Sequence, residues 1–183
     1  MVGREKEEHG GIKIGSAFFG WLTATGMAVL LTALVAAAGT AVGVATGTET
    51  GEAADSATQQ ADTIGLIGGI VLLVILFIAY YCGGYVAGRM ARFDGLKQGL
   101  AVWLWAIVVA IVVAVVGVLA GAEFNVLAQL NSFPRIPIDE GTLTTAGIIA
   151  LVAVVVASLG GALLGGLAGM RFHRKVDKTG LGH

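Results

Sequence analysis

Four long stretches without a charged residue constrain this chain more than any other feature of its sequence. They run from Ile14 to Thr48, Thr63 to Gly88, Gln98 to Ala122 and Thr142 to Met170. Each exceeds the roughly 20 residues that a helix rising about 1.5 Å per residue needs to cross about 30 Å of hydrocarbon. Transmembrane strands would alternate apolar and polar residues, whereas these stretches are apolar throughout. The sequence therefore predicts an all-α membrane protein with four transmembrane helices.

Composition agrees with this prediction. Hydrophobic residues make up 56% of the chain and its mean hydropathy is +0.87. Soluble domains hold roughly 45–50% apolar residues. Lipid is therefore the expected surrounding of most of the chain.

The basic residues lie on one side of the four stretches. All but one of the 11 lysines and arginines precede the first stretch, lie between the second and third, or follow the fourth, and Arg135 is the exception. Acidic residues such as Glu49, Asp55 and Asp139 mark the other two connections. Because basic flanks stay in the cytoplasm during insertion, we expect both termini and the central connection to be cytoplasmic.

These observations divide the chain into segments. We expect a cytoplasmic N-terminal segment at 1–13, a first helical hairpin at 14–93 with an acidic outer loop at about 40–62, a second hairpin at 94–172 with an outer loop at about 122–141, and a basic cytoplasmic tail at 173–183. In the second outer loop, Phe124, Leu127 and Leu130 recur at helical spacing, which predicts a short helix on the membrane surface.

The two hairpins resemble each other in sequence. GIKIGSAFFGW, from Gly11 to Trp21, aligns with GLKQGLAVWLW, from Gly95 to Trp105, and both read G-x-K-x-G-x-A-x-x-x-W. The match uses two of the three tryptophans of the chain. We expect two tandem hairpin repeats inserted the same way up and related by a pseudo-twofold axis along the membrane normal. Such repeats occur in transporters and also in packing units, and both interpretations stay open here.

Small residues recur at four-residue spacing, as in glycine zippers. This spacing places flat grooves on one helix face, where two backbones can approach closely in lipid. The candidate residues for helix–helix or subunit packing are Gly84, Gly88, Gly161, Gly165 and Gly169. The same spacing joins Gly39, Gly43 and Gly47, Gly65 and Gly69, and Gly117 and Gly121. The pattern leaves open whether these glycines meet helices of the same chain or of another copy.

Basic residues at the cytoplasmic ends of the helices are candidate contacts for anionic lipids, each worth about 1 kcal/mol. They are Arg89, Arg92, Lys97, Arg171, Arg174 and Lys175. The alternative is that they only orient the chain in the membrane. In the turn RFDGLK, we expect Asp94 to cap the third helix and Gly95 to relax the bend.

The sequence offers little for catalysis or for metal binding. His9, His173 and His183 lie in terminal segments, and Cys82 is the only cysteine. No paired carboxylates or zinc-binding histidine spacing accompanies them. No ionisable or amide side chain lies at mid-bilayer depth, where coupled transport ordinarily needs one. We therefore expect no enzyme activity, no cofactor, no metal site and no nucleic-acid partner.

One stretch carries a resemblance to known proteins. YYCGGYVAGRMARFDGLKQGLAVWLW, together with GGIKIGSAFFGWLTATGMAVLLTALVAA, resembles a group of four-span integral membrane proteins of high-GC Gram-positive bacteria, for which no activity is established. The resemblance is most specific from Gly83 to Gly95. It implies a multi-pass protein of the bacterial inner membrane and carries no functional residues with it.

Two functions are compatible with this sequence. The first is a non-enzymatic integral membrane protein that self-associates or serves as a structural subunit of a membrane assembly. The alternative is a small oligomeric channel or passive transporter. The partners expected in either case are the lipid bilayer, further copies of the chain or another membrane protein, and anionic lipids.

Overall fold

The chain forms four helices in this computed structural model, which describes residues 10–45, 61–124 and 145–180. They are α2 (Ile14–Ala45), α4 (Ala61–Ala91), α5 (Gly95–Phe124) and α7 (Thr145–Gly180). No strand occurs in these three ranges. Each helix contains a segment long and apolar enough to cross a membrane. The prediction of four helices long and apolar enough to span a membrane is confirmed for the described residues.

The helix bounds differ from the predicted stretches mainly at their polar ends. α2 begins at Ile14, as predicted, whereas α5 begins at Gly95, ahead of the predicted Gln98. α7 continues past Met170 to Gly180, so much of the predicted basic tail is helical. Most of the acidic outer loop, the predicted surface helix after Phe124 and nearly all of the N-terminal segment lie outside the described residues.

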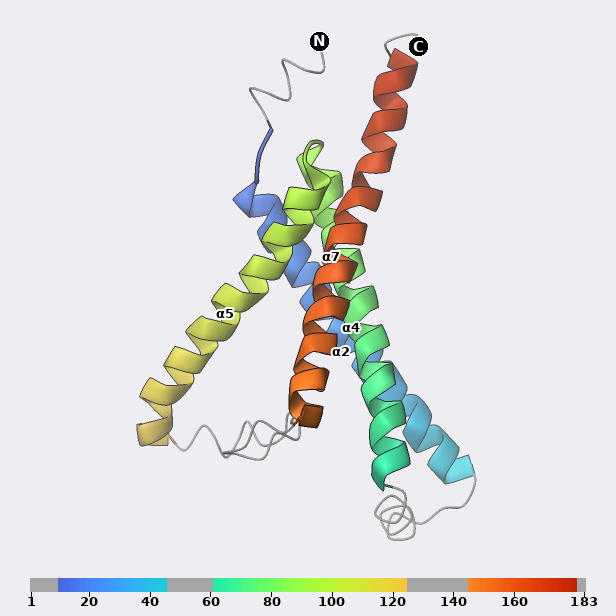
Figure 1. Ribbon diagram of the computed structural model, residues 1–183, viewed down its shortest axis with the longest axis vertical. Helices are drawn as coiled ribbons and strands as arrows, with labels where there is room; N and C mark the ends of the chain where they lie inside the picture. Colours follow the sequence, from blue (N-terminus) through green and yellow to red (C-terminus); the bar gives the residue numbers. More distant parts are fainter. Residues whose placement is uncertain (1–9, 46–60, 125–144, 181–183) are drawn as a thin grey trace.

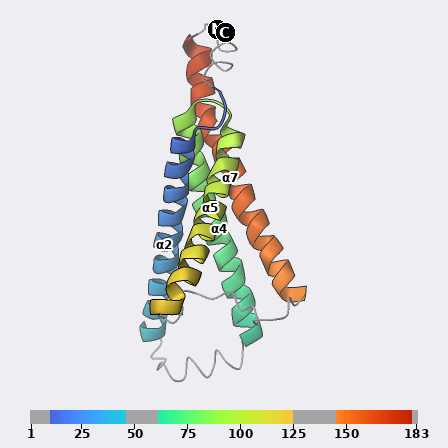
Figure 2. The same cartoon turned by 90° about the vertical axis from the view of Figure 1, so that its left-hand side faces the viewer.

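The helices alternate in direction, so the start of α2 and the end of α7 lie at the same end of the bundle (Figure 1). We call this end the basic end, because it carries Lys13, Arg89, Arg92, Lys97 and Arg171. The opposite end is called the open end. The helices converge at the basic end and separate toward the open end (Figures 1 and 2), and Figure 1 shows α5 departing from the other three.

Contacts between the helices are unequal. α4 and α7 share the most extensive interface, α2 packs on α4, and α5 packs on α7, α4 and α2. α2 and α7 share almost no contact. The most extensive interface therefore joins the two helices that carry the five predicted packing glycines.

The core consists mainly of small side chains and lies in the half of the bundle near the basic end. Its buried residues include Ala17, Ala24, Ala79, Ala87, Ala91, Ala101, Val102 and Ala162. Lipid is as apolar as leucine, so moving a large apolar side chain from lipid into a helix interface provides little driving force for helix association. Close backbone packing supplies the attraction instead. The larger apolar side chains, such as Leu30, Leu66 and Val156, point outward.

Candidate functional site

The five glycines singled out for packing all lie between α4 and α7. A Cβ atom added at Gly165 would lie less than 3.0 Å from the carbonyl oxygen of Tyr81, a separation that real Cβ atoms essentially never show. Gly161 and Gly169 stand in the same relation to the carbonyl oxygens of Phe77 and Tyr85. Successive turns of α7 from Gly161 to Gly169 therefore lie against successive turns of α4 from Phe77 to Tyr85.

Gly84 and Gly88 complete this interface from the side of α4. Cβ atoms added at these two positions would lie less than 3.0 Å from the carbonyl oxygens of Ala162 and Gly166, respectively. The obstructing atoms belong to backbone, which cannot swing away as the end of a side chain can. The sequence left open whether these glycines pack within or between chains, and the structure places all five within one chain.

A second set of close contacts joins the remaining helices. Gly95 and Gly99 of α5 lie against the carbonyl oxygens of Gly166 and Ala162 of α7, and Gly20 of α2 lies against the carbonyl oxygen of Gly83 of α4. Sequence reasoning missed these positions. Gly95 and Gly99 are themselves four residues apart. Counting alanine and serine as small residues adds Ser16, Gly20 and Ala24, and Ala162 and Gly166, which have the same spacing.

Glycines nearer the open end have no such neighbours. Cβ atoms added at Gly39, Gly65, Gly69 and Gly117 would meet nothing within 4 Å. Gly47, the third member of the first predicted stripe, lies outside the described residues. The pairs with four-residue spacing between α4 and α7 are thus in close contact, whereas the pair Gly65 and Gly69 is bare, and the surroundings of Gly43 and Gly121 lie outside the described set.

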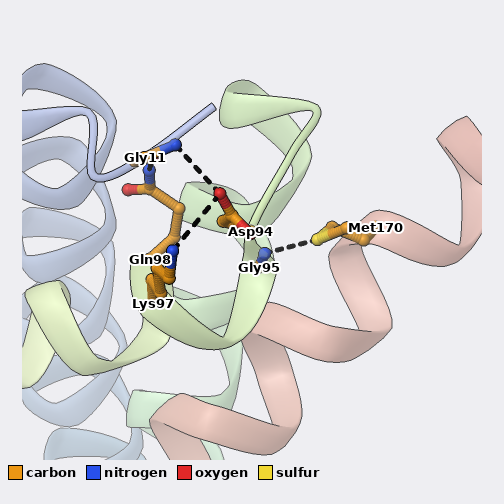
Figure 3. A network of polar contacts seen from close by, with 6 residues as sticks. All are labelled: Gly11, Asp94, Gly95, Lys97, Gln98 and Met170. Carbon is orange, nitrogen blue, oxygen red and sulfur yellow. Dashed lines mark hydrogen bonds and ion pairs between the residues drawn. The ribbon is translucent and has the colours of Figure 1, made fainter. Parts of the chain in front are cut away.

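A polar cluster ties the start of the chain to the turn between α4 and α5 (Figure 3). The backbone N–H of Gly11 donates to Asp94 Oδ2 at 2.9 Å, and Lys97 Nζ lies 3.7 Å from the same oxygen. Asp94 stands directly before α5, at the position predicted for the cap, and its largely buried carboxylate joins two segments that are distant in sequence.

Gln98 is the most deeply buried member of this cluster, with no exposed surface. Its Nε2 donates to the carbonyl oxygen of Gly11 at 3.0 Å. The Ser16 hydroxyl lies 3.2 Å from Gln98 Oε1 and 2.9 Å from the carbonyl oxygen of Lys13, and its single proton can go to either acceptor. A buried amide without partners would cost about 1–3 kcal/mol, so these bonds allow Gln98 to occupy an apolar border.

The turn itself departs from the expectation for Gly95. The left-handed backbone falls on Arg92 and Asp94, with φ of 61° and 55°, and not on Gly95. The prediction that Gly95 relaxes the bend is wrong. Gly95 is needed for close packing, because an added Cβ would collide with the carbonyl oxygen of Gly166, and its N–H donates to the Met170 sulfur (Figure 3).

The basic residues predicted to contact anionic lipids lie at the basic end. Arg92, Lys97 and Arg171 are exposed and Arg89 is half-buried, while the side chains of Arg174 and Lys175 lie outside the described set. The Arg92 guanidinium lies 5.3 Å from the centre of the Phe93 ring. Lys13 is also exposed at this end. Its position directly before α2 could have identified it as a further candidate contact for anionic lipids.

Two further side-chain hydrogen bonds connect α7 to its neighbours. Trp103 Nε1 of α5 donates to the Ser158 hydroxyl at 3.1 Å, and the carbonyl oxygen of Arg89 lies 2.7 Å from His173 Nε2. No group of three or more metal-ligating side chains occurs in the part of the chain that the structure describes. The candidate site therefore consists of the helix-packing surfaces and of the polar cluster at the basic end.

Comparison with protein-family models, with curated proteins and with solved structures gave no match to this chain. The resemblance to four-span proteins of Gram-positive bacteria stays a prediction. Function is inferred below from the contacts, burial and charges of the chain itself.

Proposed function

We propose that this chain is a non-enzymatic membrane protein that self-associates in the bilayer and serves as a structural subunit of a membrane assembly. The single observation that carries the proposal is the contrast between the two ends of the bundle. Cβ atoms added at the glycines between α4 and α7 near the basic end would meet backbone of the facing helix, whereas Cβ atoms added at Gly39, Gly65, Gly69 and Gly117 toward the open end would meet nothing within 4 Å.

The bare faces have the form that helix association in lipid uses. Gly65 and Gly69 lie one turn apart on α4, and the apolar side chains of Leu66, Ile67 and Ile70 around them are exposed. A groove of this kind accepts a helix backbone of a second copy more closely than it accepts a mobile lipid chain.

The hydroxyl groups of the first span support a structural role over a catalytic one. Thr23, Thr25 and Thr40 each donate to the carbonyl oxygen four residues earlier in α2. Hydroxyls that bond within their own helix present no arranged donor to a substrate. Close backbone packing at the basic end likewise disfavours a water-filled path through a single chain.

The proposed placement is the bacterial inner membrane, with both termini cytoplasmic and two tandem hairpin repeats. Support comes from the basic residues gathered at one end of the bundle and from the sequence match between Gly11–Trp21 and Gly95–Trp105. The first helices of the two proposed repeats, α2 and α5, contact each other, as do the second helices, α4 and α7.

The test is to count subunits in liposomes by photobleaching steps, together with the native mass in a mild detergent. We expect oligomers for the unchanged chain and a shift toward monomer for Gly69→Leu. Gly26→Leu is the matched control, because Gly26 is equally bare and has no glycine one turn away. A monomeric unchanged chain in both measurements, or equal dissociation of the two variants, would refute the proposal.

A further inference from the structure

An apolar groove of about 280 Å³ lies between the start of α2 and the middle of α5. It is lined by Ile12, Ile14, Ala17, Ala101, Leu104, Trp105 and Val108. Clefts that enclose a whole small ligand measure about 300–1,000 Å³ and bring several polar groups together. This groove is smaller, open and almost wholly apolar, which suits one part of a ligand whose remainder lies in the bilayer.

Along α5, the charged border and the groove together cover about the thickness of a single leaflet. Its lining on α5 runs from Ala101 to Val108, and Lys97 stands one helical turn before Ala101 on the same face. From Lys97 to Val108 the helix rises roughly 16 Å, close to half of the roughly 30 Å hydrocarbon thickness. A fatty acyl chain that follows this face therefore starts at the charged border and ends near the bilayer centre.

Cations mark the border end of the groove. Lys13 is exposed and lies between Ile12 and Ile14, which both line the groove. Lys97 is 60% exposed and shares Asp94 with the backbone N–H of Gly11. Two ammonium groups and one carboxylate leave a net positive charge at this end. That balance favours a lipid with a net negative head group over a zwitterionic one, whose cationic part the lysines repel.

We propose that this groove binds one anionic phospholipid of the leaflet at the basic end, with an acyl chain along α5 and the phosphate at Lys13 and Lys97. The site is separate from the bare glycine faces, so it does not depend on self-association. It also differs from a general attraction of the basic end, because Arg171 takes no part in it.

The test is native mass spectrometry of the full chain in detergent micelles that contain equal amounts of phosphatidylglycerol and phosphatidylcholine. We expect one retained phosphatidylglycerol, favoured over phosphatidylcholine. Lys13→Gln combined with Lys97→Gln should lower that preference roughly five- to tenfold. The loss of Lys13 removes about one full lysine–lipid interaction, and the loss of Lys97 removes one that Asp94 already weakens. Arg171→Gln is the matched control and should keep the preference.

Two further measurements separate the sources of the signal. Leu104→Trp should fill the groove and reduce retention of both lipids, and glycerol phosphate, which has the phosphate without the chains, should not be retained. Equal retention of the two lipids by the unchanged chain, a preference that survives loss of both lysines, or loss of preference in Arg171→Gln would overturn the proposal. Helical content by circular dichroism confirms that each variant is folded.

Discussion

Gly165→Ala tests the most demanding contact of the bundle. The added methyl group would lie less than 3.0 Å from the Tyr81 carbonyl oxygen and from the Tyr85 backbone nitrogen. Both atoms belong to a helix backbone, so relief requires α4 and α7 to move apart. That movement also loosens the contacts at Gly161 and Gly169 on the same stripe.

The magnitude follows from two opposing effects. Overpacking of a close interface costs about 1–3 kcal/mol. Replacing a helical glycine by alanine returns about 1 kcal/mol through helix propensity. The control is Gly160→Ala on the same helix, where an added Cβ meets nothing within 4 Å and only the favourable effect operates. We expect the two variants to differ in unfolding free energy by about 1–3 kcal/mol, with Gly165→Ala the less stable.

The assay is reversible unfolding in mixed micelles, in which a denaturing detergent is titrated against a mild one and helical content or tryptophan fluorescence is followed. Comparison of the two variants removes the propensity effect that they share. Equal stability of Gly165→Ala and Gly160→Ala would refute the inference that backbone contact between α4 and α7 holds the bundle together.

Two other substitutions probe polar contacts by the same unfolding measurement. Gln98→Met removes the donor to the Gly11 carbonyl and should cost about 1–3 kcal/mol, while Leu96→Met at the exposed neighbour should leave stability nearly unchanged. Equal stability of the two variants would contradict the role given to Gln98. Ser158→Ala removes the acceptor of Trp103 and should lower the unfolding free energy by about 0.6 kcal/mol, the average for hydrogen bonds between membrane helices. Thr25→Ala loses a bond within its own helix and should lower it by less. A larger loss for Thr25→Ala would count against this ranking.

The helices were predictable because lipid imposes one rule on all of them. An uncharged stretch long enough to cross hydrocarbon must be helical, whatever its neighbours. The ends were less predictable, since α7 continues beyond Met170 into a polar sequence that no hydropathy criterion selects. The role of Gly95 in the bend was misjudged. A sequence shows that a glycine is present, but not whether the fold needs its backbone flexibility or its lack of a Cβ atom.

The candidate site was predictable in kind and not in arrangement. Four-residue glycine spacing indicated close helix contact, but the identity of the facing helix depends on how the four helices pack. Gln98 was missed because an uncharged polar residue at the border of a span looks like an ordinary interfacial residue. Its partners, Gly11 and Ser16, lie far away in the sequence, and only the folded chain brings them together.

The hydrogen bond between Gly11 and Asp94 sets an order for assembly during synthesis. Gly11 is synthesised before α2 and α4, yet the Asp94 carboxylate that anchors it stands directly before the third helix. The first two helices can enter the membrane and pair while the segment before them is still unanchored. The segment at Gly11 is therefore anchored only once the turn between α4 and α5 has been made.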